Sequence, residues 1–463
     1  MMTLKKIMTW LGEGRLCGDG DLVIHRINTD SRQLSSGDLF VALQGERFDG
    51  NEFLQQAKIA GATAAIANHG LDDIDLDGIE VEDTKYALGR IAAGWRAQFK
   101  LPLVAVTGSN GKTTVTQMLA SIMKVYKQEA SLATKGNLNN EIGVPLTLLR
   151  LTNKHEVAVI ELGMNHPGEI EHLANMVKPT IALVNNAQRE HLEFMSTVEA
   201  VAYENGAVLS ALPHDGVAVF PSDDAYAEVW RTLSGKRPIL TFSMHGNASV
   251  QCINADWSHG KWLVTATTPA GSINFTLCIA GRHNVKNALA AIACSIAAGI
   301  PLSSITKGLE AFQPVSGRSK AYAIEWLQKE ITLVDDTYNA NPDSMRAAID
   351  VLAELEGARL LVLGDMGEVG EHGLQFHAEI GEYARIKKID YLFTVGHLAQ
   401  ETAKSFPTSR HFESMDALLT AVLLELNQIN SVLVKGSRFM KMEQVVQHVL
   451  KSSQAAKEQI HVA

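Results

Sequence analysis

Runs of apolar residues, separated by stretches with helical periodicity, divide the chain into regions of different pattern. Residues 1–83 hold the short apolar runs DLFVAL and ATAAIA around a helical stretch at NEFLQQAKIAGA. Residues 84–314 begin with a helical stretch, YALGRIAAGWRAQF, and continue with the apolar runs LVAVTG, VAVIELG, TIALVNNA and GVAVF. Apolar runs joined by helices predict a mostly parallel sheet. We therefore expect a small α/β domain and then a larger α/β domain.

The second half of the chain changes pattern twice. Shorter alternating runs, VQCINADW, KWLVTATT and INFTLCIA, predict an antiparallel extension of the central sheet, and the long helix HNVKNALAAIACSIAAG follows them. After Ser316-Gly317-Arg318, helical stretches alternate with the strand-like runs ITLVDDTY, RLLVLGDM, YLFTVG and SVLVKGSR. Parallel strands need crossover connections, so residues 315–463 are predicted to form a Rossmann-like doubly wound sheet. Ligands bind at the carboxyl ends of such strands, where this chain has DDTYNANPD, GDMGE and KGSR.

Composition and charge narrow the range of functions. The 463 residues are 46% hydrophobic and 20% charged, which is an ordinary globular composition. A formal net charge of -10 argues against a nucleic-acid-binding protein, which needs clustered Lys and Arg. The sequence shows neither a signal peptide nor a run of about 18 apolar residues, so we expect a cytoplasmic protein without membrane insertion. The four cysteines lack zinc or disulfide spacing and are expected to be buried, reduced thiols.

The segment TGSNGKTT, which follows the apolar run LVAV, has the composition of a phosphate-binding loop. Gly108 is nearer to Gly111 than in the usual G-x-x-x-x-G-K-[ST] motif. The segment still supplies a glycine-containing turn, a lysine, a hydroxyl for Mg²⁺ and a helix N-terminus. The residues concerned are Gly108, Ser109, Asn110, Gly111, Lys112, Thr113 and Thr114. A plain strand-to-helix turn with an exposed lysine is the alternative, but the flanking strand and helix favour a nucleotide site.

TGSNGKTT also resembles the phosphate loop of the ATP-dependent Mur ligases, which build the peptide stem of bacterial peptidoglycan, and of the related folylpolyglutamate synthases. Residues 29–53, TDSRQLSSGDLFVALQGERFDGNEF, resemble a substrate-nucleotide domain that the folate enzymes lack. TKGNLNNEIGVPLTLL, ELGMNHPGEI and GRHNVKNALAA resemble central-domain segments of the family. DDTYNANPDSM, LGDMGEVG and VLVKGSRFMKME resemble the branch that adds D-alanyl-D-alanine to UDP-N-acetylmuramoyl-tripeptide.

The resemblance implies three domains with separate roles. Residues 1–83 would bind the UDP end of the substrate, residues 84–314 would bind ATP, and residues 315–463 would bind the incoming dipeptide. The implied reaction is an ATP- and Mg²⁺-dependent ligation through an acyl phosphate, and we expect the enzyme to be a monomer. Arg318 and Asp336 resemble residues that bring the C-terminal domain onto ATP, so the site should be complete only when that domain swings in.

The resemblance also implies individual roles, because both steps of such a ligation depend on control of charge. Lys112 would neutralise the transferring phosphate, Thr113 and Glu161 would hold Mg²⁺, and His191 matches the family's histidine beside a second metal ion. Asn287 matches a family position near adenine. The implied substrate-binding residues are Ser31 and Arg32 at the uridine end, Asn137, Asn139 and Asn140 along the substrate path, and Tyr338, Asn339 and Asn341 for the dipeptide. Asparagine clusters in loops also make turns.

One position departs from the family pattern. Many of these ligases carry a carbamylated lysine fourteen residues after the histidine that matches His191, whereas this chain has Asn205 there. No lysine occurs between Lys178 and Lys236. An amide is a neutral ligand, so we expect the second Mg²⁺ to be held by His191, substrate and water, with Asn205 as a direct or water-mediated contact.

Two alternative functions stay open on the sequence. A sister ligase, either the tripeptide-forming enzyme or folylpolyglutamate synthase, would keep the ATP site and use another amine. The Asn/Asp-Pro-Arg and KGHE-like segments expected of the tripeptide-forming enzyme are absent from the sequence. A P-loop protein that uses ATP as a conformational switch would turn ATP over slowly, and this function would leave residues 29–53 unexplained.

Overall fold

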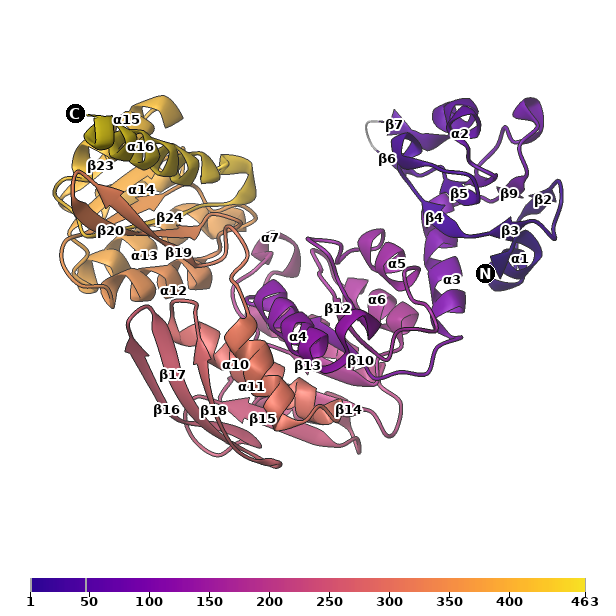
Figure 1. Ribbon diagram of the computed structural model, residues 1–463, viewed down its shortest axis with the longest axis horizontal. Coiled ribbons are helices and arrows are strands. Elements are labelled where there is room, and N and C mark those ends of the chain that lie inside the picture. The colour runs from indigo at the N-terminus through magenta and orange to yellow at the C-terminus, as the bar shows by residue number, and fades with distance from the viewer. Residues whose placement is uncertain (1, 46–47, 463) are drawn as a thin grey trace.

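Three larger β-sheets, each with its own helices, follow one another within residues 2–45 and 48–462, which are the residues that the computed structural model describes (Figure 1). Glu46 and Arg47, which belong to the predicted segment 29–53, lie outside the described residues. The lobe with the central sheet lies between the N-terminal and C-terminal lobes. The predicted three-domain α/β architecture is confirmed.

The N-terminal sheet is small and mostly parallel, with only its edge strand β2 antiparallel to its neighbour. In sheet order its strands are β2 (Arg15–Cys17), β9 (Gly78–Glu80), β8 (Ala64–Ala67), β5 (Asp38–Val41) and β4 (Arg26–Asn28). Two short pairs join β1 (Met2–Thr3) to β3 (Val23–Ile24) and β6 (Gln44–Gly45) to β7 (Phe48–Asp49). The helices are α1 (Leu4–Leu11), α2 (Leu54–Ala60) and α3 (Thr84–Arg96).

The central sheet is parallel at one end and antiparallel at the other, as the sequence predicts. In sheet order its strands are β11 (Ser131–Ala133), β12 (Val157–Glu161), β10 (Leu103–Thr107), β13 (Ile181–Val184), β14 (Val217–Pro221), β15 (Ile239–Ser243), β16 (Val250–Ser258), β17 (Lys261–Thr268) and β18 (Gly271–Leu277). Its helices are α4 (Lys112–Lys127), α5 (Gly143–Leu148), α6 (Glu169–Val177), α7 (Leu192–Met195), α8 (Val198–Ser210), α9 (Ala227–Ser234), α10 (Arg282–Ala297) and α11 (Leu302–Ala311).

Both faces of the central strands are buried, which explains why their sequences are continuously apolar. Alternate residues of β10 point to opposite faces: Val104 and Val106 pack in the core with α4, α10 and α11, whereas Leu103 and Ala105 pack in the core with α6 and α8. This two-sided core fixes the strand ends that carry the polar loops.

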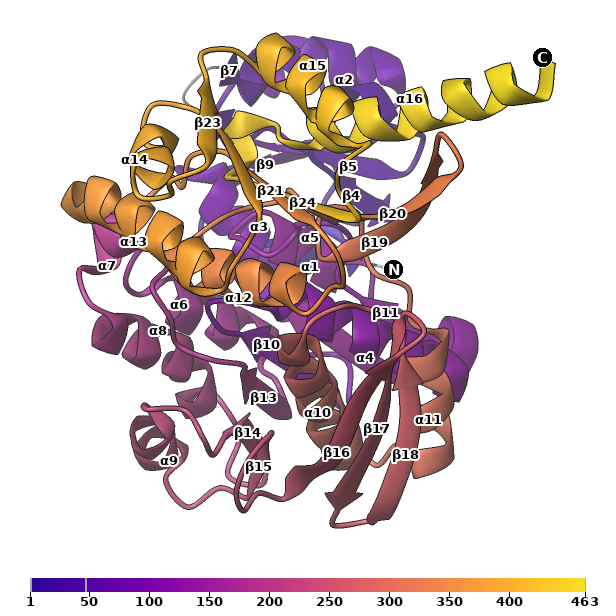
Figure 2. The same ribbon diagram turned by 90° about the vertical axis from the view of Figure 1, so that its left-hand side faces the viewer.

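The C-terminal sheet has the doubly wound form, with one antiparallel strand, β19, at its edge. In sheet order its strands are β19 (Lys320–Trp326), β20 (Lys329–Asp336), β24 (Ser431–Lys435), β21 (Arg359–Leu363), β22 (Tyr391–Val395) and β23 (Ser409–Phe412). Its helices are α12 (Pro342–Ala353), α13 (Gly373–Ile386), α14 (Ala399–Lys404), α15 (Met415–Glu425) and α16 (Glu443–Val462). Figure 2 shows α12 and α13 on the side of this sheet that faces the central domain.

Two further expectations concern the whole chain. None of the helices among the described residues is both long and apolar enough to cross a membrane. The cysteines form no disulfide within the described chain, but only part of the expectation of buried thiols is correct. Cys17 and Cys294 are buried, whereas Cys278 is exposed at the end of an antiparallel strand.

Candidate functional site

A cavity of about 700 Å³ lies where the central and C-terminal domains meet. Its walls include the loops that follow β10, β12, β13, β20 and β21 and the end of β24, so the carboxyl ends of both parallel sheets face it. This position is where ligands bind in open α/β sheets. The predicted site residues that line the cavity are Ser109, Asn110, Gly111, Lys112, Thr113, Thr114, Asn137, Asn139, Asn140, Glu161, His191, Asn287, Arg318, Asp336, Tyr338, Asn339 and Asn341.

The predicted phosphate-binding loop, residues 108–114, runs from β10 into α4, and side-chain amides bond its backbone. The backbone N–H of Gly108 donates to Asn205 Oδ1 at 2.8 Å, and the backbone N–H of Asn110 donates to Asn186 Oδ1 at 2.9 Å. Gly111 has φ of 81°, and a Cβ there would lie 2.6 Å from Asn287 Oδ1. The loop therefore needs glycine at this position for both conformation and space.

Asn205 is hydrogen-bonded within the protein. Its oxygen accepts from Gly108, and its Nδ2 donates to Val201 O at 3.2 Å and to Glu190 Oε1 at 3.5 Å. Both polar atoms of the amide are thus engaged within the protein, and Asn205 does not line the cavity. The structure thus shows Asn205 in contact with the predicted phosphate loop, and its direct or water-mediated contact with Mg²⁺ stays a prediction.

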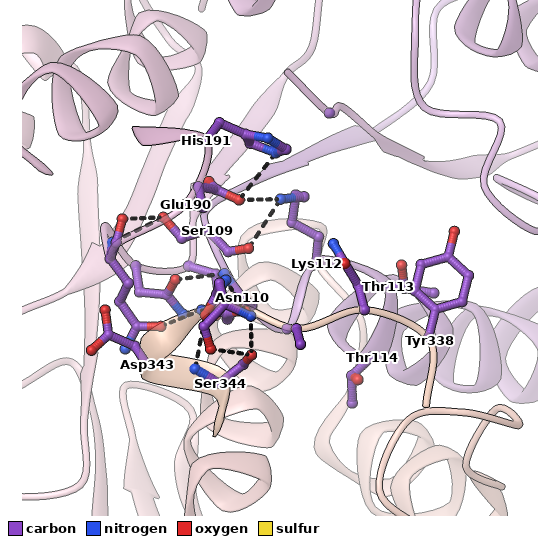
Figure 3. A pocket seen from close by; sticks show the side chains of 18 of the residues that line it. Ser109, Asn110, Lys112, Thr113, Thr114, Glu190, His191, Tyr338, Asp343 and Ser344 are labelled. Carbon is purple, nitrogen blue, oxygen red and sulfur yellow. Dashed lines mark hydrogen bonds and ion pairs between the residues drawn. The ribbon is translucent and has the colours of Figure 1, made fainter. Parts of the chain in front are cut away.

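Lys112 lies on the first turn of α4, with its side chain over the loop. Its Nζ donates to the carbonyl oxygens of Gly108 and Ser109 and lies 3.4 Å from Glu190 Oε2. Figure 3 shows this side chain pointing toward Glu190 and His191. An ammonium in this place can reach a phosphate bound in the loop.

Thr113 and Glu161 come together as predicted. The Thr113 hydroxyl donates to Glu161 Oε1 at 3.0 Å, and Asn139 Nδ2 donates to the same oxygen at 2.8 Å. The other oxygen, Oε2, is buried and has no hydrogen-bond partner. Within the described residues no group of three or more His, Cys, Asp or Glu side chains could hold a metal alone. One carboxylate with an unsatisfied oxygen and one hydroxyl nevertheless fit Mg²⁺, which takes few protein ligands and completes its shell with water and phosphate.

His191 lies in the loop between β13 and α7 and faces two carboxylates. Its Nδ1 is 2.6 Å from Glu368 Oε2, and its Nε2 is 3.8 Å from Glu190 Oε2. The hydrogen bond to His191 lowers the pKa of Glu368 below its ordinary value, despite the opposing effect of burial. His191 has a φ of 49°, a conformation that directs the turn after the loop.

The C-terminal domain contributes cations and amides to the cavity. The Arg318 guanidinium stacks over the Tyr338 ring, with its carbon 4.1 Å from the ring centroid. Asp336 accepts from the backbone N–H of Ser319 at 2.9 Å and forms an ion pair of 2.6 Å with Lys435, whose side chain is only 4% exposed. These contacts fix the orientation of the loop after β20.

Two of the predicted asparagines also accept hydrogen bonds from backbone N–H groups at the starts of helices. Asn140 Oδ1 accepts from the backbone N–H of Gly143 at 2.9 Å, at the start of α5. Asn341 is the N-cap of α12 and exchanges hydrogen bonds with Asn110, its Nδ2 donating to Asn110 Oδ1 at 3.0 Å. Asn341 thereby connects the phosphate loop to the C-terminal domain.

Asn287 lies directly under the phosphate loop. Its Oδ1 accepts from Asn185 Nδ2 at 2.9 Å, and its Nδ2 donates to Asn284 Oδ1 at 2.9 Å.

Three predicted residues do not line the cavity. Gly108 is the first residue of the loop, directly after β10, and Ser31 and Arg32 lie in the N-terminal domain. The Arg32 side chain is 81% exposed and pairs with Asp30.

An ion pair between domains was not predicted. Arg189, in the loop after β13, donates to Asp343 Oδ1 at 2.7 Å and to Glu379 Oε2 at 2.8 Å, and it stacks over Phe376. Burial alone would lower the pKa of Arg189, but the hydrogen bonds to Asp343 and Glu379 raise it above its ordinary value. Its partners lie on α12 and α13, so the contact holds the C-terminal domain against the central domain.

Glu190 and Lys435 are further cavity residues that the sequence analysis did not assign. The sequence offered a signal for both residues, because Glu190 stands beside a predicted site residue and Lys435 stands at the end of a buried strand. Glu190 precedes His191, and Lys435 ends β24 in the segment KGSR.

Comparisons with known proteins cover most of the chain. Residues 23–96 match the model described as Mur ligase family, catalytic domain; residues 106–295 match the Mur ligase middle domain; and residues 324–438 match the Mur ligase, glutamate ligase domain. The UDP-N-acetylmuramoyl-tripeptide--D-alanyl-D-alanine ligase of Escherichia coli (strain K12) is 42% identical over 443 residues, which are 95% of this chain and 96% of that protein.

Solved structures agree with this match. A crystal structure of MurF from Acinetobacter baumannii has a TM-score of 0.90 and 34% identity, and the match covers 97% of this chain and 98% of that chain. The MurF ligase from Thermotoga maritima in complex with ADP has a TM-score of 0.85 and 26% identity, with 94% and 99% covered. The chain belongs to the Mur ligase family.

Proposed function

We propose that the protein is the ATP-dependent ligase that adds D-alanyl-D-alanine to UDP-N-acetylmuramoyl-tripeptide and so forms the pentapeptide precursor of peptidoglycan. The observation that carries this proposal is the similarity along nearly the whole chain to ligases named for that reaction. This similarity includes the C-terminal domain, where the amine substrate of the reaction would be selected. The ADP complex of the Thermotoga maritima relative supports ATP as the phosphoryl donor.

The site suits a reaction in two steps. A carboxylate does not react with an amine at neutral pH, so ATP first phosphorylates the terminal carboxylate of the tripeptide. The amine of the dipeptide then attacks the acyl phosphate, and phosphate leaves. Lys112 would move from the loop carbonyls to the transferring phosphate, and Arg318 would approach it from the C-terminal domain. The backbone N–H groups at the start of α4 would hold the other phosphates.

Mg²⁺ would be held by Thr113 and Glu161, because the Glu161 oxygen without a partner faces this buried polar corner. The cation supplies positive charge that offsets the charge of the transferring phosphate. Asn139 donates to the other Glu161 oxygen and would keep the carboxylate in place.

The substrate roles of the domains are part of the proposal. Ser31 and Arg32 would bind the uridine end in the N-terminal domain, Asn137 and Asn140 would line the path of the peptide, and Tyr338, Asn339 and Asn341 would face the dipeptide. Asn287 would contact ATP from beneath the loop. The enzyme would act as a monomer in the cytoplasm, where ATP and the UDP-linked substrate are both present.

The test is a coupled assay of ADP and phosphate release by the full chain. UDP-N-acetylmuramoyl-tripeptide and D-alanyl-D-alanine together should stimulate release strongly, whereas each alone should not. Stimulation by a single amino acid or by glutamate with a folate would instead identify a sister ligase. Slow turnover that no amine accelerates would identify an ATP-driven switch.

A further inference from the structure

A carboxylate outside the predicted set, Glu190, lies in the wall of the cavity between Lys112 and His191 (Figure 3). Its side chain is only 5% exposed. Its Oε2 is 3.4 Å from Lys112 Nζ and 3.8 Å from His191 Nε2, while its Oε1 is 3.5 Å from Asn205 Nδ2. A buried carboxylate is costly unless cations or hydrogen-bond donors compensate its charge.

The contacts of Glu190 are all longer than ordinary charge-assisted hydrogen bonds, which are about 2.7–2.9 Å. The carboxylate is therefore surrounded by polar partners without being tightly bound by any of them. Lys112 is its nearest cation in the structure. When Lys112 turns to a bound phosphate, Glu190 would lose this partner and would need another positive charge.

A divalent cation between Glu190 and His191 would supply that charge. The distance of 3.8 Å from Glu190 Oε2 to His191 Nε2 is within the span of about 4.2 Å that one cation with bonds of about 2.1 Å can bridge. Glu368 Oε2 lies 2.6 Å from the opposite nitrogen, His191 Nδ1, so Nε2 is the ring nitrogen on the Glu190 side.

Asn205 lies between Glu190 and the backbone of Gly108. Its oxygen is fixed by the backbone N–H of Gly108, which turns its Nδ2 toward Glu190 Oε1. The amide thus connects the phosphate loop with the carboxylate. Where the family pattern has a charged carbamate, this chain has a neutral amide beside a permanent carboxylate.

We propose that Glu190 is a ligand of a second divalent cation beside His191 and that Asn205 is the residue that positions it. The inference rests on the proposed function, because a second cation is useful where an acyl phosphate forms. Glu190 supplies one negative charge without any reaction with CO₂. The site therefore needs no lysine carbamate.

The test counts bound Mn²⁺ by electron paramagnetic resonance, with the full chain loaded with ADP and UDP-N-acetylmuramoyl-tripeptide. The wild type should bind a second Mn²⁺ that Glu190→Gln loses or binds at least about tenfold more weakly. Glu190→Asp should recover part of this affinity. Asn205→Ala should also weaken the second Mn²⁺. Glu193→Gln, which removes an exposed carboxylate on α7, is the matched control and should bind Mn²⁺ as the wild type does.

Equal binding of the second Mn²⁺ by wild type and Glu190→Gln, with both chains folded by circular dichroism, would overturn the proposal. So would a second Mn²⁺ that disappears in CO₂-free buffer and returns with bicarbonate, because this dependence would place a carbamate in the site. The amine specificity of the wild type is measured separately. A wrong assignment of the amine would therefore leave the Mn²⁺ result interpretable.

Discussion

At the scale of single residues, Lys112 is the side chain on which the proposed chemistry depends most. It lines the cavity with its side chain only 16% exposed, bonded to loop carbonyls and to Glu190, and it belongs to no apolar core. We expect Lys112→Ala to lower ligation by at least about 100-fold, because the charge on the transferring phosphate is no longer offset. Phosphate release in the complete assay measures the effect.

Lys112→Arg should fail as well, since a planar guanidinium does not fit where a compact ammonium meets the loop carbonyls. Lys124→Ala, on the exposed side of the same helix α4, is the control and should keep full activity. Both variants at position 112 should stay folded at the assay temperature, as circular dichroism would check. Ligation by Lys112→Ala at more than about a tenth of the wild-type rate would contradict the assignment.

Single residues also mark the limit of what the sequence could predict about the site. The loop residues 108–114 are contiguous between a strand and a helix, so the sequence was sufficient to predict their grouping, and all but Gly108 line the cavity. Glu190 belongs to no such motif, and its importance depends on Lys112 and Asn205, which reach it from other elements. Arg189 likewise gains its meaning from Asp343, which is 154 positions away along the chain.

At the scale of elements, the phosphate loop is shaped by a close fit between glycines and side-chain amides. A Cβ at position 111 would lie 2.6 Å from Asn287 Oδ1 and 2.7 Å from Asn185 Nδ2. We expect Gly111→Ala to lower the thermal unfolding midpoint and to weaken ADP binding, because it adds a clash to the strain of φ at 81°.

Gly299→Ala separates the effect of backbone strain from the effect of a steric clash. Gly299 follows α10 with φ of 72°, and a Cβ there would meet nothing within 4 Å. This variant should show only backbone strain of about 1–2 kcal/mol and unchanged ADP binding. If both variants lost equal stability and bound ADP equally well, the packing of amides against the loop would have no role. Calorimetry with ADP and a thermal melt of each variant decide the question.

Strands with two buried faces were predictable, whereas the two edge strands of the C-terminal sheet were not. Continuous apolar runs identified β10, β12 and β13, because helices cover both faces of these strands. The sequence analysis did not identify β19 or β23 as strands. Their residues KAYAIEW and SRHF mix apolar and polar side chains, since an edge strand is partly exposed. The position of Ser31 and Arg32 relative to the cavity was equally hidden, because no local pattern encodes domain orientation.

At the scale of the whole molecule, Arg189 holds two domains together. It bonds Asp343 on α12 and Glu379 on α13 and stacks on Phe376. Arg346 also donates to Glu379, at 3.1 Å, from within the C-terminal domain. Arg189 and Asp343 line the cavity together with Arg318, so movement of the C-terminal domain that breaks this contact would also move Arg318 away from the predicted phosphate loop.

The contact should depend on pH in a defined direction. The hydrogen bond from Arg189 lowers the pKa of Glu379 below its ordinary value of 4.5. A group with a lowered pKa in the folded state stabilises fully above its ordinary pKa, and this contribution is lost as the pH falls through the lowered value. The difference in unfolding midpoint between wild type and Arg189→Ala should therefore stay constant from pH 7 to pH 4.5 and shrink below. A difference that grew on acidification would have the wrong sign for this ion pair.

Removal of the ion pair should also change the shape of the molecule. Truncating one member of a hydrogen-bonded charge pair costs about 2–5 kcal/mol and leaves its partners uncompensated. Arg189→Ala without ligands should therefore scatter X-rays with a larger radius of gyration than the wild type, because the C-terminal domain spends more time away from the central domain. ADP and UDP-N-acetylmuramoyl-tripeptide should compact both proteins, since their binding bridges the same domains.

Arg189→Lys should behave like Arg189→Ala, because an ammonium cannot bond two carboxylates in the plane of a guanidinium. Arg385→Ala removes an arginine that bonds only Glu382 on its own helix, and it should leave the radius unchanged. If Arg189→Ala and the wild type scattered identically with and without ligands, the domains would be held by other contacts, and closure would not depend on Arg189.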